Sequence, residues 1–154
     1  MPERGIDGIA ELKTFIGQEV GVSDWFTVTQ ALIEAFADVT QDRQWIHLDT
    51  ERAKTESPFG TTIAHGFLTL SLLTHLHTQA VKVRHDYQMA INYGFNRVRF
   101  TSPVPAGARI RMRSKLQALE ELQGGVQIIW IVTVEIENHP KPALIAEWVG
   151  RLYQ

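Results

Sequence analysis

The segment from Ala108 to Leu119 alternates apolar and polar side chains over its whole length, and this pattern constrains the fold more than any other feature of the sequence. Ile110, Met112 and Leu116 fall on one face, while arginine, lysine and glutamine side chains fall on the other. Because successive side chains of a strand point to opposite faces, the alternation predicts a long antiparallel strand with one buried face. The chain should therefore form a sheet that covers a core on one side.

Most of the C-terminal half behaves in the same way, in segments separated by turn residues. Further strands are expected at 24–28, 92–102, 126–137 and 144–153. The prolines within 103–107 end one strand, because proline cannot donate to a sheet ladder, and 120–125 and 139–142 supply turns. About five strands are predicted.

Two segments in the N-terminal half have the period of a helix. In 29–37, Leu32, Ile33 and Phe36 share one stripe, which is typical of a short amphipathic helix. Residues 66–80 are richer in leucine, and the leucines cover most of the helix circumference. A helix that is apolar on nearly all sides is expected to be buried on nearly all sides.

These elements predict an α+β fold in which an antiparallel sheet wraps around one long central helix. That arrangement is the hot-dog fold. No internal repeat and no long linker divides the sequence, so residues 1–154 are expected to form a single domain.

The composition excludes several classes of function. Lys and Arg number 15 against 17 Asp and Glu, so the formal net charge of −2 provides no basic surface for nucleic acid. Cysteine is absent, which excludes disulfides, thiolate nucleophiles and Cys-based metal sites. Neither a secretory signal nor a stretch of about 20 apolar residues is found, so we expect a cytoplasmic protein with no membrane segment.

Acid, amide, aromatic and imidazole side chains crowd together after the first helical segment, between residues 36 and 49. Asp42 and His47 lie five positions apart, which would separate them by about 140° on a regular helix. They can therefore act on one substrate only if the segment between them is bent. The alternative from spacing alone is that Asp42 caps a short helical turn and His47 is a half-buried surface histidine.

The same segment contains an aromatic residue, an acid, an aliphatic residue followed by a histidine, and a small residue six positions further on. These residues are Phe36, Asp42, Ile46, His47 and Ala53. The pattern resembles the signature of the MaoC-like dehydratases, a family that includes the (R)-specific enoyl-CoA hydratases, although Gln44 and Trp45 stand where that family has Asn and Pro. Together with residues 23–30, this version is similar to the nodulation protein N-like branch, and the resemblance extends over about residues 15–152.

The resemblance implies an enzyme that adds water to a trans-2-enoyl-CoA, or a related acyl thioester, to form the (R)-3-hydroxyacyl product. Asp42 and His47 would jointly hold the water, with His47 taking its proton and Asp42 supplying the proton to Cα. The opposite assignment stays open. No cofactor is needed beyond the CoA of the substrate. An isolated hot-dog sheet would leave an edge strand unpaired, which predicts a homodimer, and the resemblance places the acyl pocket near its interface.

The negative charge that develops on the thioester oxygen requires a hydrogen-bond donor. The sequence Ala64-His65-Gly66 opens the long apolar helix. Gly66 is the candidate donor, because the first N–H groups of a helix are free and a residue without Cβ allows close approach. Ala64 and His65 are grouped with it as substrate-binding residues. The alternatives are that Gly66 merely begins the helix and that His65 caps it.

Other polar and aromatic residues favour structural roles. His75 and His77 point about 200° apart on a helix, so they cannot share a metal ion; a partly solvated helix end is expected, and no metal site is predicted. Tyr93, Phe95 and Trp130 are interpreted as core residues rather than the lining of an acyl tunnel. The strand arginines are interpreted mainly as a solvated face from which a few could contact CoA phosphates: Arg97, Arg99, Arg109, Arg111 and Arg113.

Two alternative functions remain open at this point. The chain would be a non-catalytic subunit that binds acyl thioesters if Gln44 and Trp45 displace Asp42 from the water. It would be a thioesterase on the same fold if it cleaves the thioester instead of hydrating it. The acyl chain length depends on packing and is not determined by the sequence.

Overall fold

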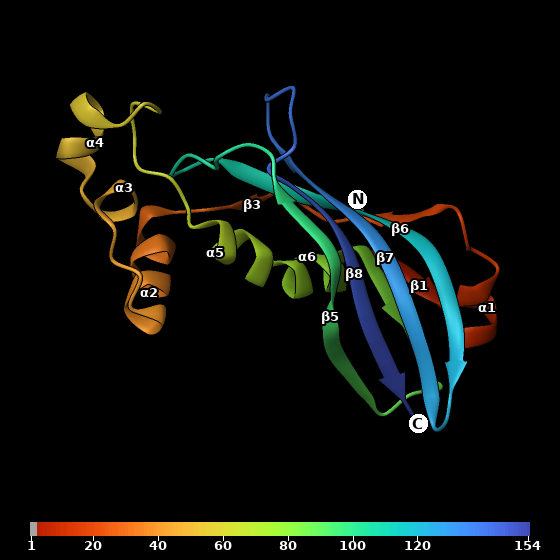
Figure 1. Cartoon of the computed structure of the whole chain (residues 1–154). Coiled ribbons are helices and arrows are strands. Elements are labelled where there is room, and N and C mark those ends of the chain that lie inside the picture. Colours follow the sequence, from red (N-terminus) through yellow and green to blue (C-terminus); the bar gives the residue numbers. More distant parts are fainter. Residues whose placement is uncertain (1–2) are drawn as a thin grey trace.

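The computed structural model describes residues 3–154 (Figure 1). Along the chain, the elements are β1 (Arg4–Ile6), α1 (Ile9–Lys13), β2 (Glu19–Val22), β3 (Phe26–Thr27), α2 (Gln30–Thr40), α3 (Trp45–Leu48), α4 (Thr50–Glu56), α5 (Gly66–Ser71), α6 (Leu73–Ala80), β4 (Val81–Val83), β5 (Met89–Phe100), β6 (Arg109–Leu122), β7 (Gly125–Ile136) and β8 (Leu144–Tyr153). None of the helices within 3–154 is long and apolar enough to cross a membrane.

The main sheet has the strand order β2-β6-β7-β8-β5, and β3 also pairs with β6. All of its pairs are antiparallel. The long predicted strands correspond to β5, β6, β7 and β8, whereas the segment 24–28 contains only the two residues of β3. The predicted total of about five strands is too low for the described residues, because neither β2 nor the small parallel sheet of β1 and β4 has a recognisable pattern in the sequence.

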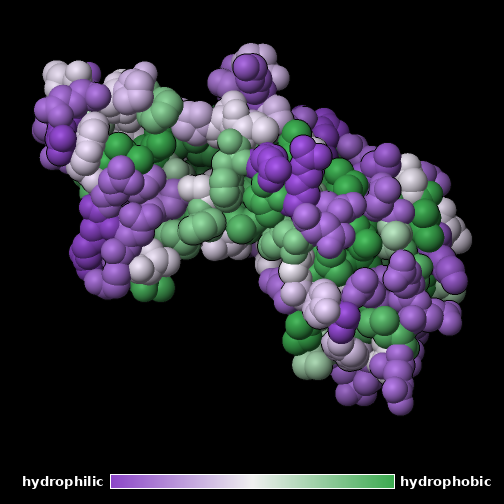
Figure 2. Space-filling model, in the orientation of Figure 1, coloured by the Kyte–Doolittle hydropathy of each residue, from purple (hydrophilic) through white to green (hydrophobic). Residues whose placement is uncertain are grey.

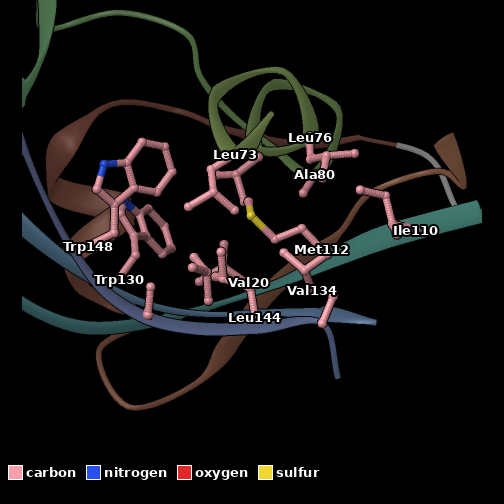
Figure 3. Close-up of a cluster of buried hydrophobic side chains, with 14 of the residues drawn as sticks. Val20, Leu73, Leu76, Ala80, Ile110, Met112, Trp130, Val134, Leu144 and Trp148 are labelled. Carbon is pink, nitrogen blue, oxygen red and sulfur yellow. The ribbon is translucent and has the colours of Figure 1, made fainter. Parts of the chain in front are cut away.

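The main sheet curves around α6, which confirms the predicted α+β hot-dog fold (Figure 1). Along β7, every second side chain is buried, from Val126 to Ile136. Met112 of β6 and Val134 of β7 lie against the same cluster as Leu73 and Leu76 of α6 (Figure 3), and all four side chains are fully buried. The apolar face of the alternating strands is therefore the wall of the core.

The central helix differs from its prediction in two respects. It is divided at Leu72 into α5 and α6, although Leu72 keeps a right-handed conformation (φ −74°, ψ −11°). Burial on nearly all sides is wrong for both parts, because α6 buries Leu73, Leu76 and Ala80 on one face but exposes Thr74, His75 and Thr78. In α5 the side chain of Phe67 is 67% exposed. The reason is that α5 extends past the end of the sheet (Figure 1), so the strands of this chain cover only part of its apolar surface.

Helices α2, α3 and α4 lie together beyond the sheet, next to α5 (Figure 1), and we call them the overhang. α2 begins after Thr29, whose Oγ1 accepts a hydrogen bond of 3.1 Å from the amide of Leu32. It ends at Gln41, which adopts the left-handed conformation (φ 65°). This left-handed residue turns the chain out of the helix immediately before Asp42.

Strand β5 is an edge of the main sheet and pairs, within the described residues, only with β8. Its large apolar side chains are exposed: Met89, Ile91, Tyr93, Phe95 and Phe100. The prediction that Tyr93 and Phe95 belong to the core is therefore wrong, because this chain does not cover its edge strand, whereas Trp130 is buried as predicted. Figure 2 shows that the surface is hollowed below α5, between the overhang and the sheet.

Candidate active site

His47 lies in α3, and its side chain is buried. The Nδ1 atom is 2.7 Å from the carbonyl oxygen of Ile63. A carbonyl can only accept a hydrogen bond, so Nδ1 carries the proton and, in the neutral ring, Nε2 has a free lone pair. The backbone around His47 is braced as well: Gln30 Nε2 donates to the His47 carbonyl at 2.8 Å, and the Thr62 hydroxyl donates to Gln30 Oε1 at 2.6 Å.

Burial lowers the pKa of His47 below its ordinary value of 6.5. The hydrogen bond to Ile63 and the charge of Asp42 raise it, while the neighbouring His65 lowers it further. The lowering effects are stronger, so the imidazole is neutral at pH 7. A neutral imidazole with a free Nε2 can accept a proton from a substrate or from water.

His65 is buried between two other rings. Its centroid lies 3.8 Å from that of His47, with 24° between the planes, and 5.0 Å from that of Phe36. Its Nε2 donates to the backbone carbonyl of Asp42 at 3.0 Å, and its buried Nδ1 has no hydrogen-bond partner among the described residues. His65 occupies the N-cap position of α5 but makes no capping hydrogen bond. It therefore contacts both Asp42 and His47.

Asp42 lies in the bent segment between α2 and α3, and it is exposed. One of its carboxylate oxygens, a ring nitrogen of His47 and a ring nitrogen of His65 all lie within 4.8 Å of one another. The bend that the five-residue spacing requires is thus present. The structure brings the carboxylate and both imidazoles to one place at the start of α5.

Gln44 and Trp45, which depart from the family pattern, leave Asp42 in this position. The backbone amide of Gln44 lies 3.4 Å from Asp42 Oδ1. The ring of Trp45 instead packs under the guanidinium of Arg52 in α4, 4.0 Å from the ring centroid. The non-catalytic alternative depends on displacement of Asp42, and this geometry does not support it.

Ala64 and Gly66 differ in whether their amides are available. The Ala64 N–H donates to the Val104 carbonyl at 2.8 Å, so it cannot also bind a substrate oxygen. The Gly66 N–H forms no hydrogen bond within the part of the chain that the structure describes. A Cβ at Gly66 would lie 3.1 Å from the ring of Phe100, so close packing is a second reason for glycine here.

The cluster of Asp42, His47 and His65 contains residue types that bind metals. The lone pair of an imidazole nitrogen lies in the plane of its ring, and Zn²⁺ binds there at about 2.0–2.1 Å. Because the two rings are stacked with nearly parallel planes, one ion cannot lie in both planes. This geometry argues against a shared ion, and the absence of a metal site stays a prediction.

Comparison with known proteins decides the family. The model of the MaoC like domain matches residues 11–136. The chain belongs to the MaoC-like family. It is 50% identical over 149 residues to 3-hydroxyacyl-thioester dehydratase Z of Mycobacterium tuberculosis, with 96% of this chain and 97% of that protein covered. It is 48% identical over 143 residues to Nodulation protein N of Rhizobium leguminosarum, with 92% and 88% covered.

Solved structures of the MaoC-like family have the same fold. The R-hydratase PhaJ1 from Pseudomonas aeruginosa has a TM-score of 0.71 and 23% identity, with 94% of this chain and 84% of that chain covered. The (R)-hydratase from A. caviae has a TM-score of 0.67 and 25% identity, with 88% and 98% covered. These comparisons confirm, at the level of the family, the resemblance indicated by the residues around Asp42 and His47.

Sequence reasoning missed the groups that hold this MaoC-like site in place. The carbonyl of Ile63 fixes the tautomer of His47, and Gln30 and Thr62 fix its backbone. A backbone carbonyl has no signature in the sequence. Of these groups, only Gln30 could have been noticed in the sequence, because it belongs to the segment 23–30 that contributes to the family resemblance.

Proposed function

We propose that this chain is an (R)-specific hydratase/dehydratase that interconverts trans-2-enoyl thioesters and (R)-3-hydroxyacyl thioesters. The observation that carries the proposal is the pairing of the Asp42 carboxylate with a neutral His47 whose Nε2 is free. Hydration needs one group that takes a proton from water and one that gives a proton to Cα. The names of the relatives, a 3-hydroxyacyl-thioester dehydratase and an (R)-hydratase, support this reaction.

In the proposed mechanism, a water molecule lies between Asp42 and His47. Nε2 of His47 takes a proton from the water, and the hydroxide adds to Cβ of the enoyl thioester. The imidazolium passes this proton to the Asp42 carboxylate, and Asp42 delivers it to Cα as the electron pair of the double bond moves toward the thioester oxygen. Both side chains are then in their starting states, and the product has gained one water.

We propose that the Gly66 N–H stabilises the charge on the thioester oxygen. Gly66 is the first residue of α5, and His65 before it is extended (φ −59°, ψ 137°), which is the conformation that a residue before proline prefers. Gly66→Pro should therefore fold while lacking the donor. Gly66→Ala is the matched control, because it adds the same Cβ against Phe100 but keeps the N–H.

The proline variant should hydrate the thioester 10²–10³ times more slowly than the alanine variant, as estimated for the loss of one such donor. Equal kcat/KM values for the two folded variants would show that the oxyanion is held elsewhere.

His65 acts in this proposal as a positioning residue rather than a substrate contact, because its ring already binds Asp42 and stacks on His47. His65→Gln keeps an N–H donor near Asp42 and removes the stacked ring. Since His65 lowers the pKa of His47, the acid limb of the kcat/KM profile should move to higher pH in this variant. His65→Phe keeps a ring and removes the donor, so kcat should fall with little change in KM. A rise in KM alone would show direct substrate contact.

The test of the function itself follows the absorbance of a conjugated enoyl thioester together with a thiol reagent. Hydration bleaches the absorbance and releases no thiol, whereas hydrolysis by a thioesterase releases thiol and binding alone does neither. The stereochemistry of the 3-hydroxyacyl product is then read by chiral chromatography. Thiol release, or no reaction with any chain length, would refute the proposal.

A homodimer is the proposed assembly. The free edge of β5 is 12 residues long and carries exposed aromatic and aliphatic side chains, a combination that promotes pairing with another strand. Two copies paired along β5 would protect both edges, and each would fill the hollow below the other's α5 (Figure 2). A neighbour of the same fold comes from the ChsH1-ChsH2 complex of Mycobacterium tuberculosis, at a TM-score of 0.60 and 14% identity. Sedimentation of the purified chain at the monomer mass would refute the homodimer.

Two arginines are the best candidates for the CoA phosphates. Arg111 and Arg113 share Glu135, at 2.6 and 2.7 Å, and Arg113 also pairs with Glu19 at 3.0 Å, so two carboxylates neutralise the two guanidinium groups. Arg97 and Arg99 form no ion pair within residues 3–154 and line a common depression. Their replacement by alanine should raise KM for a CoA thioester but not for the pantetheine thioester, which lacks the nucleotide; equal effects on both substrates would contradict the assignment.

Three expectations from the sequence accompany this proposal. We propose that residues 1–154 form one domain, and the joint packing of Ile6, Leu12 and the sheet in one core cluster supports it. The cytoplasmic location and the absence of a cofactor beyond the CoA of the substrate stay predictions.

A further inference from the structure

A cavity of about 600 Å³ lies along α6, away from the candidate active site at the start of α5. Helix α6 forms one wall with Thr74 and His77, and β7 and β8 contribute Trp130 and Trp148. Asn92 of β5 lies at the free edge of the sheet, 3.4 Å from the Thr74 hydroxyl. In Figure 3 the two indoles lie at one end of the core cluster, on the far side of Leu73 from Ile110.

His77 is the unusual residue of this wall. Its ring lies edge-on to both indoles, with centroids 4.7 Å from Trp130 and 5.4 Å from Trp148. The expectation of a partly solvated position holds for both histidines of α6, since His75 is exposed and His77 is partly buried. Burial lowers the pKa of His77 to about 4, so the ring is uncharged at pH 7.

The hydrogen bond to Ser114 decides which nitrogen of His77 carries the proton. Nδ1 lies 3.2 Å from the Ser114 hydroxyl, which is completely buried in β6. Among the described residues, this hydroxyl has no other acceptor, so it donates to Nδ1 and leaves the proton on Nε2. Nε2 forms no hydrogen bond within the described residues. The aromatic cavity therefore contains an uncharged N–H donor that lacks an acceptor, and the buried indole N–H of Trp148, which also lines the cavity, lacks one as well.

The cavity lies in the direction that an acyl chain would take from the proposed active site. Thr74 follows Gly66 by eight residues, which is about 12 Å along a helix axis. Between them, the exposed surface of α5 faces the hollow of Figure 2 rather than the sheet. A thioester held at Gly66 can thus extend its chain along this surface and into the cavity beside Asn92.

We propose that this cavity binds the distal part of the acyl chain and that His77 Nε2–H selects chains that carry an oxygen acceptor there, such as an ether, hydroxyl or carbonyl oxygen, over plain alkyl chains. The inference rests on the proposed hydratase function and names its substrate class. The indole faces accept the apolar part of such a chain, and the N–H group pairs with the oxygen. A plain alkyl chain that fills the cavity would bury the His77 N–H without an acceptor, which is unfavourable.

The experiment uses pairs of 2-enoyl thioesters of equal length, in which one methylene is replaced by an ether oxygen at successive positions. At one position, the wild type should prefer the oxygen-containing member by about tenfold in kcat/KM, the value of one good hydrogen bond. His77→Phe keeps a ring between the indoles but lacks the donor, so the ratio should fall to about one. His77→Gln keeps an N–H donor and should retain the preference. His75→Phe, on the exposed side of the same helix, should behave as the wild type.

The outcomes separate the inference from the function on which it rests. Hydration of all pairs without preference, or an unchanged preference in His77→Phe, would overturn the inference and leave the function standing. If the wild type hydrates no thioester, the proposed function fails. Quenching of tryptophan fluorescence by the same thioester pairs then decides whether the cavity prefers the oxygen. If His77→Phe does not fold, His77→Leu removes the donor with a smaller side chain and gives the same test.

Discussion

Acid should destabilise this protein through the protonation of His77. The pKa of the His77 ring is 6.5 when it is exposed in the unfolded chain and about 4 when it is buried in the folded protein. Between these two values the unfolded chain binds a proton that the folded chain does not. The contribution of neutral His77 is therefore complete above pH 6.5, and it is lost as the pH falls toward 4.

The size of the effect follows from the difference between the two pKa values. One unit of pKa corresponds to about 1.4 kcal/mol, so protonation of His77 lowers the free energy of unfolding by about 3 kcal/mol once the pH is below both values. At pH 4.5 the loss relative to pH 7 is about 2.4 kcal/mol by the same relation. That is a large share of the 5–15 kcal/mol that stabilises an ordinary domain.

The assay is urea unfolding at pH 7 and pH 4.5, at one protein concentration, for the wild type, His77→Phe and His75→Phe. Carboxylates contribute equally to all three proteins, so they cancel in the comparison. The stability of the wild type and of His75→Phe should fall by about 2 to 3 kcal/mol more between the two pH values than that of His77→Phe. The same fall in all three proteins would refute the burial argument for His77.

Further outcomes are expected for the active site, the core and the free edge. Asp42→Asn and His47→Gln should each lower kcat/KM for hydration by at least about 10² with an unchanged circular dichroism spectrum, and a folded variant of near-normal rate would contradict the acid–base roles. Leu73→Asp places an unpaired carboxylate in the fully buried face of α6 and should prevent soluble folding; a soluble variant that melts cooperatively would be inconsistent with the central helix. Ile91→Lys should dissociate the proposed dimer without unfolding the chain, as measured by sedimentation, and a dimer that survives it would place the interface elsewhere.

The long strands were predictable because their periodicity is sustained. The segment 108–119 repeats its pattern often enough to fix both the strand and its buried face, and β6 and β7 show that face. By contrast, β1 has three residues and β2 has four, and so few residues show no period. The pairing of β2 depends on where the middle of β6 comes to lie, and that of β1 on where β4 comes to lie, and both are properties of the assembled fold.

The sequence was enough to predict the side chains of the site, but not the backbone groups that hold them in place. Asp42 and His47 were found because their residue types and spacing suit acid–base chemistry in a bent segment. The tautomer of His47 depends on the carbonyl of Ile63, and any residue at position 63 would supply the same atom. Ala64 was grouped with Gly66 for proximity, but the loop places its amide against Val104. Which of the two amides is left without a hydrogen bond depends on how the segments that contain Ala64 and Val104 pack against each other.

The leucine-rich central helix carries information about assembly as well as about the core. A helix with apolar residues on every side implies that every side is covered, but the pattern does not state which chain covers it. The sheet of this chain covers the apolar face of α6, whereas the apolar Phe67 of α5 stays exposed beside Phe100 of the edge strand, with ring centroids 6.0 Å apart. The large apolar side chain of the helix that stays uncovered is thus next to the proposed active site and the unpaired strand. A second copy that covers this surface would complete the burial that the sequence predicts, and it would close the path from Gly66 to the cavity at His77.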